Sequence, residues 1–137
     1  MSIKRVSFSD GYTSEVAPST DVLYSGPSVV KAIANNVSTA VDLVGLVFSP
    51  DDYKGFVIDY VIKRKTDSAL SELSEIGQIT GNYNTRLSTW NYSYQSTGDY
   101  SGVELSVTSL GQFQYVSSNI SGDNYEGELS YVISRAF

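Results

Sequence analysis

The side chains best suited to chemistry in this sequence are carboxylates, because the chain has no Cys and no His. Thiolate and histidine-based catalysis are therefore excluded. Paired carboxylates can act as acid and base in glycoside cleavage. However, Asp51 and Asp52 follow Pro50 in a predicted turn, and Glu104 and Glu128 occupy polar positions of alternating segments, so we interpret them as solvated. We expect no enzyme and no catalytic residue. The acids considered are Asp51, Asp52, Asp59, Asp99, Glu104, Asp123, Glu126 and Glu128.

One loop offers oxygen ligands of the kind that calcium prefers. Asp123, Asn124, Tyr125 and Glu126 are consecutive, but they lack the fixed spacing of an EF-hand loop. A polar turn is the simpler interpretation. We therefore predict neither a metal site nor any other cofactor.

Aromatic side chains are the main candidates for a binding site. Trp90, Tyr92 and Tyr94 alternate with Asn91 and Ser93, so they share one face of a predicted strand. Facing outward, they would form a platform for stacking on sugar rings. Facing inward, they would belong to the core or to a subunit interface. Alternation with polar residues favours the inward orientation, in the core or in an interface, and the ligand platform remains the alternative.

The surrounding pattern predicts an all-β domain folded as a single antiparallel β-sandwich, because short alternating segments are separated by turn residues. Gly111 is expected to turn a hairpin in which Phe113 and Tyr115 pack against Val103, Leu105 and Val107. A strand is favoured over a helix for 72–82, and 28–34 stays ambiguous. The other expected strands are 41–48, 56–64, 88–95, 103–108, 112–116 and 128–133.

Residues 1–27 are interpreted as an extended N-terminal arm, and residues 28–137 as the sandwich domain. The arm contains the turn dipeptide Asp10-Gly11 and Pro18, which resists ladder pairing. Ile3 to Phe8 alternates and is a possible strand. The arm could cover an edge of its own domain or reach a neighbouring subunit.

The charge balance argues against two classes of partner. The net charge is −6, and the only basic cluster is Lys63-Arg64-Lys65, which we interpret as a solvated strand end. A nucleic-acid binder of this size would normally carry a basic patch, so none is expected. No apolar run approaches the roughly 20 residues that a membrane helix needs, so no membrane partner is expected.

From Ile33 to the C-terminus the sequence resembles small β-sandwich, jelly-roll-like modules of structural proteins from tailed bacteriophages. A Gly-Gln turn precedes an aromatic-bearing strand in GVELSVTSLGQFQYVSSNISG (102–122), and a Tyr-x-Gly-x-Leu strand follows in YEGELSYVISRAF (125–137). Further matching segments are IANNVSTAVDLVGLVF (33–48), YVIKR (60–64) and SELSEIGQITGNYN (71–84).

The resemblance implies a non-enzymatic protein located in the virion, of the head decoration or tail fibre type. It also implies a homotrimer that attaches to other virion proteins of the capsid or tail. A carbohydrate- or host-receptor-binding module, with a glycan as ligand, is the alternative.

Overall fold

The computed structural model describes residues 28–68 and 72–137. The predicted arm of residues 1–27, including the possible strand from Ile3 to Phe8, lies outside the described residues. None of the described residues forms a helix long and apolar enough to span a membrane.

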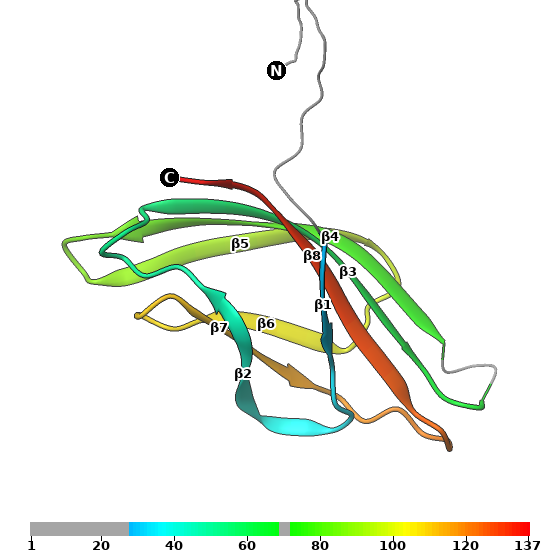
Figure 1. Cartoon of the computed structure of the whole chain (residues 1–137). Coiled ribbons are helices and arrows are strands. Elements are labelled where there is room, and N and C mark those ends of the chain that lie inside the picture. Colours follow the sequence, from blue (N-terminus) through cyan, green and yellow to red (C-terminus); the bar gives the residue numbers. More distant parts are fainter. Residues whose placement is uncertain (1–27, 69–71) are drawn as a thin grey trace, which may run out of the picture.

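The described chain forms two antiparallel sheets packed face to face, so the predicted all-β sandwich is confirmed (Figure 1). The larger sheet has the order β1-β8-β3-β4-β5, and the smaller has the order β2-β7-β6. The first two described strands pair with the last two, β1 with β8 in the larger sheet and β2 with β7 in the smaller. This arrangement is typical of a jelly roll. The strands are β1 (Val29–Ala32), β2 (Val37–Val47), β3 (Gly55–Lys65), β4 (Leu73–Asn84), β5 (Thr89–Gly98), β6 (Val103–Val107), β7 (Gln112–Ser117) and β8 (Glu126–Ala136).

The segment that could have been a helix is the 12-residue strand β4, as favoured. Its two inward glycines leave room for aromatic neighbours on β3. Gly77 lies opposite Tyr60 and Gly81 opposite Phe56, and a Cβ at either glycine would collide with the facing ring. Each ring therefore covers a glycine across the ladder, which stabilises a strand that would otherwise be weak.

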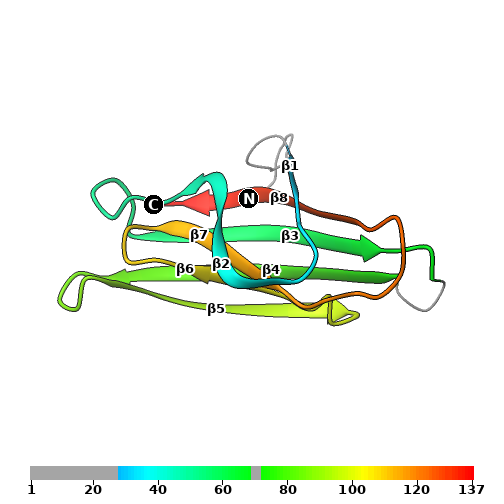
Figure 2. The same cartoon turned by 90° about the horizontal axis from the view of Figure 1, so that it is seen from below.

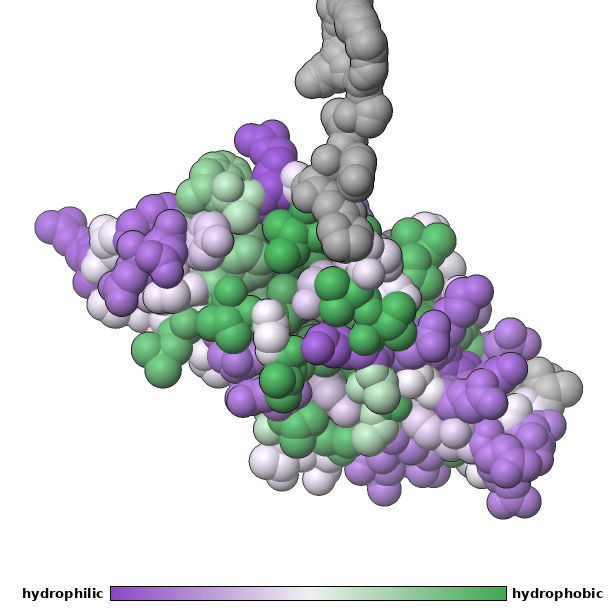
Figure 3. Space-filling view, in the orientation of Figure 1, coloured by the Kyte–Doolittle hydropathy of each residue, from purple (hydrophilic) through white to green (hydrophobic). Residues whose placement is uncertain are grey.

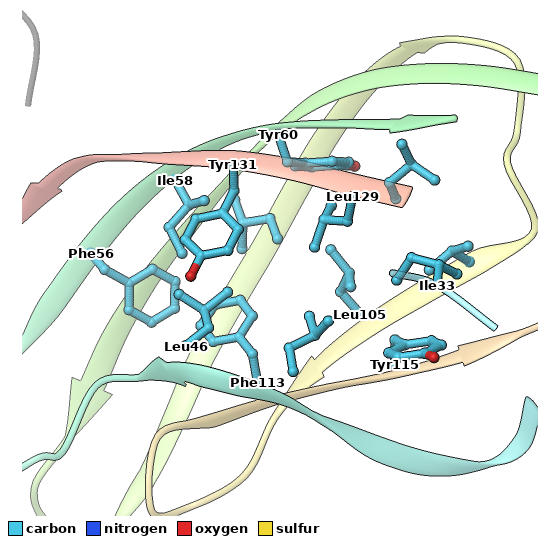
Figure 4. Close-up of a cluster of buried hydrophobic side chains, with 14 of the residues drawn as sticks. Ile33, Leu46, Phe56, Ile58, Tyr60, Leu105, Phe113, Tyr115, Leu129 and Tyr131 are labelled. Atoms are coloured by element: carbon cyan, nitrogen blue, oxygen red, sulfur yellow. The ribbon is translucent and has the colours of Figure 1, made fainter. Parts of the chain in front are cut away.

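The core lies between the two sheets (Figure 4). The hairpin prediction is confirmed, since Phe113 and Tyr115 are buried and pair directly with Val107 and Leu105. Gly111 turns the hairpin with φ of 86°. The main chain of Phe48 leaves no room for a side chain at this turn.

The smaller sheet does not cover the whole inner face of the larger one. With three strands against five, its edge strand β6 lies below β4, and β5 extends beyond it (Figure 2). All residues of β5 from Asn91 to Gly98 are exposed. This uncovered margin is where the predicted aromatic site lies.

Candidate functional site

Trp90 belongs to the core, as the favoured inward orientation predicted. Only 4% of its surface is exposed. Its ring centroid lies 5.1 Å from that of Phe56 and 5.2 Å from that of Tyr83. Its indole Nε1–H is buried and has no hydrogen-bond partner among the described residues. Trp90 is therefore unavailable to a ligand.

Tyr92 and Tyr94 share the inward side of β5 with Trp90, but they are not core residues. Their exposed fractions are 37% and 42%. The sequence pattern identified the face correctly, but the covering sheet ends before these two rings. Tyr100 is exposed in the turn after β5, and its hydroxyl donates to Glu104 Oε2 at 2.9 Å. Tyr92, Tyr94 and Tyr100 are called the tyrosine strip below.

Two phenols of the strip, those of Tyr94 and Tyr100, are held in their neutral form. Partial burial, followed by the Glu104 carboxylate, raises the pKa of Tyr94. The hydrogen bond to Glu104 raises the pKa of Tyr100. Neutral phenols can stack and can donate and accept hydrogen bonds. The strip is thus suited to binding a polar, ring-containing partner or another protein surface.

Arg64 corrects the interpretation of the basic cluster. Lys63 and Lys65 are exposed, as expected, but Arg64 is 1% exposed and points between the sheets. Its guanidinium makes five hydrogen bonds, to three different connecting segments. Nη1 donates to Ser101 O (2.7 Å) and Ser118 Oγ (3.5 Å), Nη2 to Ser118 O (2.5 Å) and Asn35 Oδ1 (3.0 Å), and Nε to the Tyr125 hydroxyl (3.1 Å). All its donors are occupied, so Arg64 has a structural role and links the three connecting segments.

A buried acid completes this network. Glu75, 3% exposed, accepts from the Tyr60 hydroxyl at 2.7 Å and from both the amide (3.0 Å) and the hydroxyl (2.7 Å) of Ser101. Since Ser101 O accepts from Arg64, one fully buried serine connects the two charges. Tyr60, Glu75, Ser101 and Arg64 are called the buried polar network below. Sequence reasoning missed its role, although Glu75 and Arg64 both occupy inward positions of their strands.

The acids considered as catalytic candidates all lie on the surface. Glu104, Glu126, Glu128 and Asp59 are exposed, and Glu126 pairs with Lys65 at 3.7 Å. In the candidate calcium loop, Asn124 donates to Asp67, and the Tyr125 hydroxyl donates to Ile33 O. The described residues contain no group of three or more acids arranged to hold a metal ion.

A hollow of about 930 Å³ opens between the ends of β1, β3 and β8. Arg64, Tyr115 and Tyr125 line it, together with exposed charged side chains at its rim. The polar groups of these three residues already hydrogen-bond to the protein itself. The inner wall of the hollow therefore offers a ligand few free partners, and the tyrosine strip is the better candidate.

The buried polar network predicts a loss of stability in alkali. Burial, followed by the hydrogen bond to Glu75, raises the pKa of Tyr60 above its ordinary value of 10.0. Folding therefore favours the protonated phenol, and this contribution is complete below pH 10 and is lost as pH rises through the folded-state pKa. Above pH 10 the free energy of unfolding should fall by up to about 1.4 kcal/mol per pH unit from this group. Urea titrations at several alkaline pH values measure the slope, and Tyr60→Phe should flatten it. An equal slope in the variant would contradict the assignment.

Comparison with known proteins gives a likeness to a solved structure. No protein family and no curated protein matches this sequence. Among solved structures, the tailspike protein of Acinetobacter phage vB_ApiP_P1 matches with a TM-score of 0.53 and 12% identity over 92% of this chain. The matched part is 25% of the tailspike chain. At this identity the likeness establishes a shared fold: this chain is an antiparallel β-sandwich of a kind found in a phage tailspike.

Proposed function

We propose that this chain is a non-enzymatic structural module of a phage virion, which associates with copies of itself and attaches to the capsid or tail. Its fold, shared with part of a phage tailspike, supports a virion role.

The observation that carries the proposal is a set of exposed apolar side chains on β1 and β2. Val30, Val41, Val44 and Val47 each expose more than two fifths of their surface. Figure 3 shows apolar residues gathered on the side of the molecule where these strands lie. Grouped exposed apolar side chains are typical of association surfaces. We refer to these four residues as the exposed valines and infer that they are covered in the assembled state.

Association is expected to give a trimer, as the resemblance to phage modules implies. We expect light scattering to give a mass of three chains, or a multiple of three, for the full chain and for residues 28–137, which contain all the described strands. Val44→Lys should lower the mass because it places a charge at the most exposed of these valines. Thr80→Lys, on the outer face of β4, is the control. A monomer for both lengths of chain would contradict self-association.

Carbohydrate or host-receptor binding is the second candidate function. The observation that favours it is the exposure of Tyr92 and Tyr94 side by side on β5, next to Tyr100 and its partner Glu104. Aromatic faces with nearby hydrogen-bonding groups suit sugar rings. Trp90 is not part of this platform because it is buried.

A further inference from the structure

Strand β5 is an open edge of the larger sheet. It pairs only with β4 among the described strands, in a continuous register from Asn84↔Thr89 to Glu75↔Gly98 without a bulge. Its other side therefore presents a row of backbone N–H and C=O groups with which no described strand pairs. Such edges readily accept another strand, and proteins usually protect them with charges, prolines, bulges or short length.

β5 lacks each of these protections, unlike the other three edges among the described strands. Its ten residues include no charged residue and no proline. By contrast, β1 has only four residues and carries Lys31. β2 contains Asp42 and has two irregularities in its pairing, and β6 has five residues and carries Glu104. β5 is thus the edge best suited to pairing with another strand.

We propose that β5 pairs antiparallel with β5 of a second copy across a two-fold axis, which joins two five-stranded sheets into one. A two-fold axis sets a strand against itself, so a charged residue near the axis would meet its own charge. β5 brings no such charge. This contact goes beyond the proposed function, since it needs neither the exposed valines nor a virion partner.

The tyrosines determine the register of this pair. With Ser93 on the axis, Tyr92 of each copy lies opposite Tyr94 of the other, and cross-strand aromatic pairs stabilise a sheet. Ring surface that the smaller sheet leaves exposed is then covered. The same register directs Arg86, in the turn before β5, toward Asp99 of the second copy, in the turn after it. Opposite charges thus approach each other at both ends of the contact.

Ser93→Lys tests this pairing because it places two lysines opposite each other on the axis. Thr80→Lys is the matched control, since Thr80 is the register partner of Ser93 on β4, a strand that is already paired on both sides. We expect Ser93→Lys to halve the mass measured by light scattering and Thr80→Lys to leave it unchanged. An equimolar mixture of Ser93→Lys and Ser93→Glu should restore the mass, because lysine then faces glutamate.

The outcomes separate this contact from the proposed trimer. A change from six chains to three supports both, whereas a change from two chains to one supports β5 pairing and contradicts the trimer. A mass of three chains that Ser93→Lys leaves unchanged supports the trimer and overturns β5 pairing. A wild-type monomer overturns both. If the mixture of Ser93→Lys and Ser93→Glu does not regain the wild-type mass, β5 pairing alone is overturned.

Discussion

Replacing Arg64 with Met should destabilise the fold by about 3–5 kcal/mol, because it removes one charged member of a buried network and leaves the other members in place. Methionine fills much of the same volume but makes none of the five hydrogen bonds. The carbonyls of Ser101 and Ser118 then lose their guanidinium donor. Buried Glu75 also loses its link, through the hydrogen bonds of Ser101, to a positively charged group. Urea unfolding at neutral pH measures the loss.

Lys63→Met is the control for this experiment. Lys63 is the exposed neighbour of Arg64 on β3, and surface substitutions of this kind usually change stability by about 0.5 kcal/mol or less. Glu75→Gln tests the link between the charges: if Ser101 couples them, the double variant should lose less than the sum of the single losses. A loss below about 1 kcal/mol for Arg64→Met would show that the network does not hold the three connections together.

Strand positions and inward faces could be predicted from this sequence because alternation reports them directly. The pattern of β3 places Arg64 on the same side as Ile58, Tyr60 and Ile62. The prediction that Arg64 is solvated was wrong because it relied on the charge of the side chain and not on its inward position in the alternating pattern. The partners of Arg64 lie in separate connections, at Asn35, Ser101 and Ser118, and no local spacing indicates that these connections meet.

The exposure of the tyrosine strip could not be predicted for a different reason. Alternation tells which residues share a face, but not how far the opposite sheet extends over that face. Trp90 and Tyr94 have the same parity on β5, yet only Trp90 lies under the covering layer. The difference depends on the division of the eight described strands into sheets of five and three, which is a property of the whole topology. Predictions for this site therefore need the packed structure.

Trp90→Ala should also cost about 3–5 kcal/mol, because it removes a large buried ring from the contacts with Phe56 and Tyr83. Trp90→Phe should recover most of this loss, since it keeps an aromatic ring and deletes an N–H that has no partner in the described part of the chain. Tyr94→Ala is the matched change on the same face and should cost roughly 1 kcal/mol, as expected for a half-exposed cross-strand neighbour. Urea unfolding gives the order of the three variants.

The same variants separate a core from a glycan platform. If the tyrosine strip binds sugar, Tyr94→Ala should abolish binding on a glycan array while the protein stays folded, and Trp90→Phe should keep it. Binding that survives Tyr94→Ala but is lost in Trp90→Phe at unchanged stability would place the ligand at Trp90. That result would contradict the burial of the indole ring. Equal stability of Trp90→Ala and wild type would contradict it more directly, because a buried tryptophan cannot be removed without opening a cavity between β5 and the rest of the core.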